Sequence, residues 1–277
     1  MFPIGRRSNT RRRPGACALV VVALLLLGAG DTARALDLFT LWHQQEIPLD
    51  LTPGSWVLYK SQTMASGRSD FDLTRVSCLP APAAADSRNR VFEIIPMTQN
   101  EQGDFLPVAG QGVWLLVSGD IAAREGKLVD LVREAWQWED GQAKRLAVSD
   151  LKNDPVAAGM LASDFRPDTL EEAGNTTRII SGQQFLCAQL VMSARDSQCV
   201  DLPAGRMSQI TNHEITAAYH PDLPLLGLAY VAERISSAST LDSPNPRFRA
   251  PPPRNRVEIM ELVGFGRDAV SLLGPGD

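Results

Sequence analysis

The stretch FDLTRVSCL, residues 71–79, alternates two sets of side chains along its length. Successive residues of a β-strand point to opposite faces of a sheet, so this alternation predicts a strand with two different faces. One face carries Phe71, Leu73 and Arg75, and the other carries Thr74, Val76 and Cys78. The run WVLY, residues 56–59, predicts the preceding strand, and Gly67 between the two runs predicts a turn.

Further short runs, rich in β-branched and aromatic residues, follow this pair along the chain. They predict strands at 90–97, 112–118, 177–191, 198–202, 207–219, 226–236 and 257–265. The segment 155–165 predicts a short helix with Pro155 near its start. Strands and helices do not alternate regularly, which favours an antiparallel sheet and the α+β class.

Residues 127–150 are ambiguous between helix and strand. Apolar residues from Leu128 to Ala135 fit helical spacing, whereas Asp140-Gly141 is a strong signal for a tight hairpin turn. We interpret the segment as a hairpin whose first strand carries Trp136 and Trp138 on one face.

The first 35 residues predict export. Five arginines precede the apolar run of residues 16–27, and Ala33-Arg34-Ala35 follows, in the order of a secretory signal peptide with its cleavage site. The run is too short for a membrane-spanning helix, which needs about 20 apolar residues. Cys17 stands before the apolar run rather than after it, which argues against a lipoprotein signal. We expect a signal peptide at 1–35, no integral membrane segment after its removal, and a single β-rich domain at 36–277.

The net charge of the exported part of the chain limits the kinds of partner that it can bind. Six of the 27 basic and one of the 32 acidic residues lie in 1–35, which leaves 21 bases and 31 acids, a formal net charge of −10. A negative surface repels phosphate backbones, so we expect no nucleic-acid partner.

The exported body contains Cys78, Cys187 and Cys199. Disulfides persist outside the cytoplasm, and the short separation of Cys187 and Cys199 predicts a bridge across a hairpin. The alternative is that all three are small buried hydrophobic residues. A metal-binding cluster would need close cysteine pairs such as C-x-x-C, which the chain lacks.

Two stretches resemble a zinc-protease motif and a dinucleotide-binding motif, but their residue spacing does not fit either one. His213-Glu214 lacks the second histidine of a zinc-protease motif, because position 217 is alanine and His220 lies too far along. The glycine pattern GFGRDA, residues 264–269, has no room after it for a dinucleotide-binding unit. We expect no enzyme and no cofactor, with an unrecognised hydrolase as a third possibility.

Two groups of residues are candidate binding sites. Tryptophan combines a large apolar area with a polar N–H group, so Trp114, Trp136 and Trp138 are candidates for the wall of an apolar ligand site, or for core positions. The segment 242–256 contains five prolines and predicts a long exposed loop. Its four arginines are candidates for binding a partner, or are solvated: Arg247, Arg249, Arg254 and Arg256.

Four short motifs resemble exported bacterial proteins of unassigned function with a LolA/LolB-like envelope fold. They are PGSWVLY (53–59), LPAG (202–205), HPDLPLLGL (220–228) and ELVGFG (261–266). The resemblance covers 53–79 and 183–270, and the proline-rich segment and the middle of the chain depart from it. It implies a curved antiparallel sheet or half-barrel with short covering helices over an apolar cavity, and a lipid or lipoprotein as ligand.

These observations together predict a periplasmic or secreted, non-enzymatic protein. We expect it to bind an apolar ligand, such as a lipid or a lipoprotein acyl chain, in the concavity of the sheet. The alternative is an interaction module that contacts another envelope protein through the 242–256 loop.

Overall fold

The computed structural model describes residues 41–273 apart from 66–67, 154–165, 203–204, 244 and 246–247. These residues belong to the compact unit Ala35–Asp277. The predicted signal peptide at 1–35 and the predicted helix at 155–165 lie outside the described residues.

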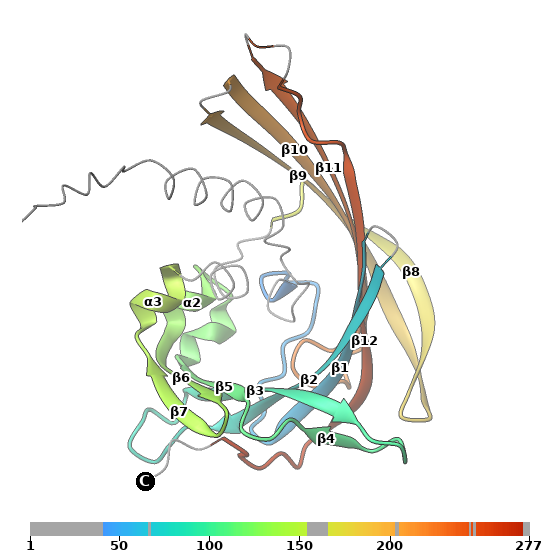
Figure 1. The fold of residues 1–277 in the computed structure, drawn as a ribbon. Helices are drawn as coiled ribbons and strands as arrows, with labels where there is room; N and C mark the ends of the chain where they lie inside the picture. Colours follow the sequence, from blue (N-terminus) through green and yellow to red (C-terminus); the bar gives the residue numbers. More distant parts are fainter. Residues whose placement is uncertain are drawn as a thin grey trace, which may run out of the picture. The chain divides into compact units, whose positions relative to one another are not determined.

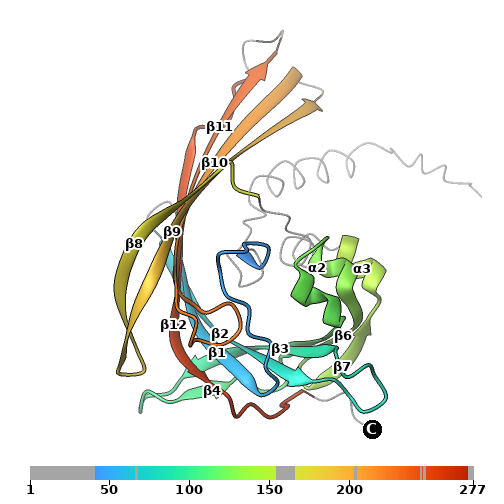
Figure 2. The same ribbon diagram turned by 180° about the vertical axis from the view of Figure 1, so that it is seen from behind.

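The unit is built around one open, curved, 12-stranded sheet in which every neighbouring pair is antiparallel (Figures 1 and 2). The strand order is β7-β6-β5-β3-β2-β1-β12-β11-β10-β9-β8, with β4 paired to β3. The strands are β1 (Ser55–Ala65), β2 (Arg68–Pro80), β3 (Arg90–Gln99), β4 (Phe105–Pro107), β5 (Gly112–Val117), β6 (Val132–Glu139), β7 (Gln142–Leu146), β8 (Thr169–Ile180), β9 (Gln183–Leu202), β10 (Gly205–Tyr219), β11 (Leu228–Asp242) and β12 (Arg254–Gly266). The predicted α+β class with a curved antiparallel sheet and short covering helices is confirmed.

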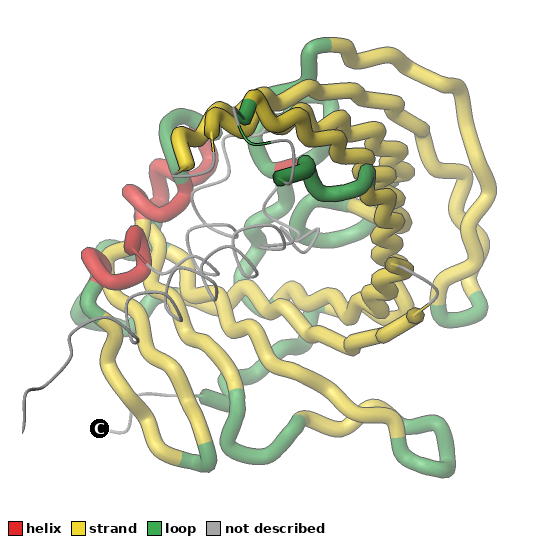
Figure 3. Tube along the Cα trace, turned by 45° about the horizontal axis from the view of Figure 1, so that its top comes forward, coloured by secondary structure: helices red, strands yellow, loops and turns green. Residues whose placement is uncertain are grey.

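The helices in the described part are short and lie inside the curve of the sheet (Figure 1). They are the 3₁₀ helix η2 (Gly119–Ala123) and the α-helices α2 (Leu128–Leu131) and α3 (Val148–Asn153). The segment of residues 41–51, blue in Figure 1, also runs along this concave side, and Figure 3 shows the strands wrapping around the helices and loops inside the curve.

Two tight turns explain one correct and one wrong strand prediction. Asp140 and Gly141 both have positive φ angles, 50° and 78°, and join β6 to β7 as predicted. Ser181 and Gly182 have nearly the same angles, 49° and 78°, and join β8 to β9. The single strand predicted over 177–191 is therefore wrong, because the chain reverses direction inside it.

The predicted disulfide between Cys187 and Cys199 is wrong. Both residues lie on β9, which is one continuous strand rather than the two arms of a hairpin. Twelve residues of strand span roughly 40 Å, far beyond the ~7 Å that a disulfide can bridge between Cα atoms. Cys78, Cys187 and Cys199 are free thiols, the first two buried and the third exposed.

The main core lies on the concave face of the sheet. Val57, Val76, Phe92 and Leu115 point to this side from four neighbouring strands, and side chains from 41–51 and from the helices pack on them. The alternation predicted for residues 71–79 is confirmed, because Val76 and Cys78 belong to this core whereas Leu73 packs on the opposite face.

The opposite face of the sheet carries two smaller clusters. One contains Leu58, Leu73, Ile95 and Met97, and the other contains Trp114 with Leu79 and its neighbours. Residues 267–273, which follow β12, cross this face, and Leu273 and Ala269 pack on the two clusters.

Candidate functional site

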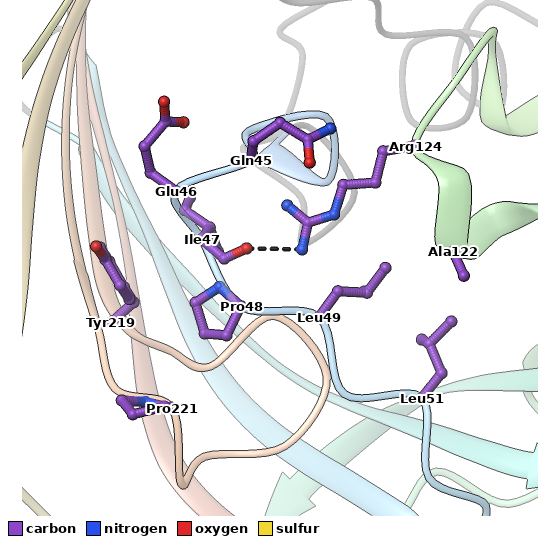
Figure 4. A pocket seen from close by; sticks show the side chains of 10 residues that line it. All are labelled: Gln45, Glu46, Ile47, Pro48, Leu49, Leu51, Ala122, Arg124, Tyr219 and Pro221. Carbon is purple, nitrogen blue, oxygen red and sulfur yellow. Dashed lines mark hydrogen bonds between the residues drawn. The ribbon is translucent and has the colours of Figure 1, made fainter.

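A pocket of about 490 Å³ opens on the concave side, between residues 45–51, the end of η2 and the end of β10 (Figure 4). Its volume falls within the range of roughly 300–1,000 Å³ that is common for small-molecule sites. The apolar part of its wall consists of Ile47, Pro48, Leu49, Leu51, Ala122 and Pro221, and the polar part consists of Gln45, Glu46, Arg124 and Tyr219.

The 45–51 wall of the pocket is fixed by the burial of its neighbours and by backbone pairing. Leu41, Trp42 and Ile47 are buried in the main core. Asp50 and Leu225 exchange two backbone hydrogen bonds, of 2.7 and 3.1 Å, which join the segment to the turn between β10 and β11.

Arg124 connects the 41–51 segment to η2. Its Nη2 donates a 2.6 Å hydrogen bond to the carbonyl oxygen of Ile47, and its Nη1 donates to the carbonyl oxygen of Gln44. Nδ1 of His43 donates a 3.0 Å hydrogen bond in the reverse direction, to the carbonyl oxygen of Arg124. Burial lowers the pKa of the Arg124 guanidinium, and the nearby Glu46 carboxylate opposes this shift.

Tyr219 and Glu46 lie on the side of the pocket away from Arg124 (Figure 4). Tyr219 ends β10, where a register shift between Ala218 and Tyr219 interrupts the ladder with β11. Burial raises the pKa of the Tyr219 phenol, and the carboxylates of Glu172 and Glu46 raise it further. This wall is therefore negative or neutral, whereas the Arg124 wall is positive.

The three tryptophans predicted to wall the concavity do not lie there. Trp114 and Trp136 pair across β5 and β6, and Trp138 follows on the same face, with the rings of Trp136 and Trp138 centred 6.4 Å apart. This face packs against Leu79, Val91 and Ala269, opposite to the main core. The two tryptophans of β6 share a face as predicted, but their placement in the concavity is wrong, because period two puts them on the other side of the sheet from Leu115 and Ala135.

The four arginines predicted to form a basic loop are separated. β12 begins at Arg254, so Arg254 and Arg256 belong to a strand, and Arg256 forms an ion pair with Glu258. Arg249 is exposed in the loop, and Arg247 lies outside the described residues. The prediction of one exposed loop over 242–256 is wrong at both ends, because β11 extends to Asp242 and β12 takes up the last three residues.

The two histidines of the incomplete zinc motif have different surroundings. His213 is buried on β10, where its Nδ1 lies 2.7 Å from Glu233 Oε1 and its Nε2 lies 3.5 Å from Asp196 Oδ2. His220 accepts a 3.2 Å hydrogen bond from the backbone N–H of Asp222 in the turn after β10. Within the described ranges, no group of three or more His, Cys, Asp or Glu side chains could hold a metal ion.

Sequence reasoning missed the pocket and Arg124 at its wall. The sequence pattern predicts no element over 41–51, and Arg124 lies in a polar stretch between two predicted elements. The signal available was the proximity in sequence of Pro48, Leu49 and Leu51, an apolar run outside the predicted strands.

Comparison with known proteins gives a result only at the level of structure. No family model matches the chain, and no curated protein matches it. The chain is similar to a LolA superfamily protein. That crystal structure, from Nitrosomonas europaea, has 10% identity and a TM-score of 0.32, and the match covers 84% of this chain and 93% of that one.

Two further crystal structures are similar to the chain. A putative outer membrane lipoprotein-sorting protein domain from Vibrio parahaemolyticus has 11% identity and a TM-score of 0.29, over 87% of this chain and 91% of that one. A DUF1329 family protein from Desulfovibrio piger has 9% identity and a TM-score of 0.27, over 77% and 85%. These structures include a LolA superfamily protein and a lipoprotein-sorting domain, the kind of protein that the sequence motifs resemble. The function is argued below from the residues of this chain.

No helix within the described residues is long and apolar enough to span a bilayer.

Proposed function

We propose that the protein is an exported, non-enzymatic envelope protein, periplasmic or secreted, that binds an apolar ligand on the concave side of its sheet. The ligand class is a lipid or the acyl chain of a lipoprotein. The observation that carries the proposal is the open pocket beside residues 45–51, whose wall is mostly aliphatic.

The position of the pocket limits where such a ligand would bind. The chain's own side chains fill the concave face beneath α2 and α3, including Leu128, Val129 and Leu151. The proposed site is therefore the pocket itself, and not the whole concavity that the sequence predicted. An aliphatic ligand there would cover Leu49 and Leu51, and burial of apolar area contributes about 25 cal/mol per Å².

Two neighbouring alanines provide a matched test. Ala122 and Ala123 are both exposed on η2, but only Ala122 lines the pocket. Ala122→Trp should occupy the pocket and weaken the binding of a fluorescent fatty acid at least tenfold, whereas Ala123→Trp should leave it unchanged. Equal affinities for both variants and the wild type would place any binding elsewhere.

Native mass spectrometry tests the ligand class directly. Protein purified from the envelope should carry a species that organic extraction releases and that is absent from the Ala122→Trp variant. A wild-type protein that carries none, and that binds no added fatty acid, would contradict the proposal.

A second candidate is an interaction module for another envelope protein, which uses the loop between β11 and β12. The observation in its favour is the exposed Phe248, next to the exposed Arg249. Replacing both residues by serine leaves β11 and β12 intact and should abolish a cross-linked partner. An unchanged set of cross-linked proteins would count against this candidate.

A further inference from the structure

Arg124 is a charged pocket residue that forms no ion pair within the described part of the chain. Two of its N–H groups bond to carbonyl oxygens, which are neutral acceptors. No Asp or Glu side chain of the described residues forms an ion pair with it, and the Glu46 carboxylate acts on it only across the pocket (Figure 4). Burial disfavours the charged form of Arg124 and lowers its pKa.

The backbone at Arg124 is also unusual. Its φ angle is 57° and its ψ angle 29°, in the left-handed region that residues with a Cβ atom rarely occupy. Such a conformation is strained for a residue with a Cβ atom, and it recurs at ligand sites where the surrounding structure imposes it. Here the N–H group of Arg124 bonds to the carbonyl oxygen of Ile121, and this cap directs the side chain into the pocket.

The remaining N–H groups of the guanidinium are suited to an anion. Arginine presents five donors in a planar fork that matches the oxygens of a carboxylate or a phosphate. The two bonds to the carbonyl oxygens of Gln44 and Ile47 hold this fork in one orientation, so little side-chain freedom is left to lose on binding.

The two walls of the pocket would orient an amphiphile. An anionic group is favoured at Arg124 and disfavoured near Glu46, while Leu49 and Leu51 offer an aliphatic surface in the same pocket. We propose that the pocket binds a single-chain amphiphile with an anionic head, a carboxylate or a phosphate, with the head at Arg124 and the chain on Leu49 and Leu51. This inference rests on the proposed function, because it specifies the ligand of the same pocket.

A series of 12-carbon amphiphiles that differ only in the head tests the inference. The heads are carboxylate, phosphate, trimethylammonium and hydroxyl, and affinity is measured by displacement of a fluorescent fatty acid and by native mass spectrometry. The wild type should bind one or both anionic heads about 10–100-fold more tightly than the alcohol, the range expected for charge-assisted hydrogen bonds. The tighter of the carboxylate and the phosphate identifies the head.

The Arg124→Gln variant separates head recognition from a structural role. Glutamine can still donate to a carbonyl oxygen, but it has no charge. Its preference for the anion over the alcohol should fall to within about threefold, while its affinity for the alcohol stays unchanged. Arg133→Gln, an exposed arginine outside the pocket, is the control and should behave as the wild type.

The outcomes distinguish this inference from the proposed function. If the wild type binds all four heads with similar affinity, the inference fails and the apolar site stands. If Arg124→Gln weakens every amphiphile equally, Arg124 only holds the 41–51 segment, and the inference again fails. If the wild type binds none of the four, the proposed function itself fails.

If the glutamine variant does not fold, the wild-type series and its salt dependence still test the inference. Only an amphiphile with an anionic head should bind more weakly as the salt concentration rises.

Discussion

Glu93 on β3 accepts a 3.1 Å hydrogen bond from the backbone N–H of Leu273, which lies 180 residues further along the chain. The same carboxylate accepts a 2.9 Å bond from the N–H of Leu272 and a further bond from Ser271 Oγ. Glu93 is fully buried, so these donors replace the water that the carboxylate would otherwise bind. The contact fixes residues 271–273 on the outer face of the sheet, where Leu273 covers Leu58 and Ile95.

Glu93→Gln should destabilise the protein. The amide keeps the size of the side chain, but it removes the charge and places an NH₂ group opposite backbone donors. We expect the free energy of unfolding to fall by about 1–3 kcal/mol, measured by urea denaturation. Glu101→Gln, in an exposed turn, should leave it unchanged. Equal stability of Glu93→Gln and the wild type would show that the 271–273 contact contributes nothing.

Two glycines of β12 should differ sharply in their tolerance of alanine. A Cβ atom at Gly266 would lie 2.6 Å from Nε1 of Trp56, whereas one at Gly264 would lie 3.5 Å from the same ring, an ordinary contact. The Trp56 ring cannot move aside without cost, because it donates a 2.7 Å hydrogen bond to Asp268 and the Arg75 guanidinium lies over it. Gly266→Ala should therefore cost about 1–3 kcal/mol of unfolding free energy, and Gly264→Ala much less. The reverse order in urea denaturation would contradict this packing.

The free thiols should react at very different rates. Hydrogen bonding to Ser208 lowers the pKa of the exposed Cys199, whereas burial raises the pKa of Cys187 and raises that of Cys78 to about 12. Because the thiolate is the reactive form, one thiol should react rapidly with a disulfide reagent near neutral pH, and two more should react only after unfolding. The measurement uses a Cys17→Ser background, and Cys199→Ser should abolish the rapid phase. A single free thiol, reactive only after unfolding, would instead restore the disulfide between Cys187 and Cys199.

Asp50 should stabilise the fold fully above its ordinary pKa and progressively less below it. Burial alone would raise the pKa of this carboxyl, but hydrogen bonds from Thr52 and the ion pair with Arg267 outweigh it, and the pKa is lowered. A carboxyl with a lowered folded-state pKa stabilises the fold above about pH 4 and loses this contribution as the pH falls through the folded value.

Asp50→Asn tests this contribution. At pH 6 the variant should be less stable than the wild type by roughly 0.5–1 kcal/mol, a small value because Arg267 is half exposed. At pH 2–3 the difference should shrink toward zero. A difference that is constant between the two pH values would mean that the charge of Asp50 plays no part.

Local pattern was sufficient for most strands and for the sheet class. Alternation over residues 71–79 identified β2 and the two faces of the sheet, because a strand with one face in the main core must follow period two. Asp140-Gly141 identified its hairpin because both positions need positive φ angles, which aspartate and glycine tolerate. Ser181-Gly182 makes a turn with similar angles but was missed, because serine at that position is an unusual choice.

The sequence by itself determined an antiparallel β-rich fold, the positions of most strands and the shared face of Trp136 and Trp138. These follow from interactions between neighbours in the chain, from side-chain period and from turn chemistry. Only the tertiary structure decided which face of the sheet is concave, and it placed the three tryptophans on the opposite face. It also brought Arg124 to the carbonyl oxygen of Ile47, 77 residues away, and formed the pocket between them. Such contacts depend on the curvature of the whole sheet, which many strand pairings set together and which no local pattern encodes.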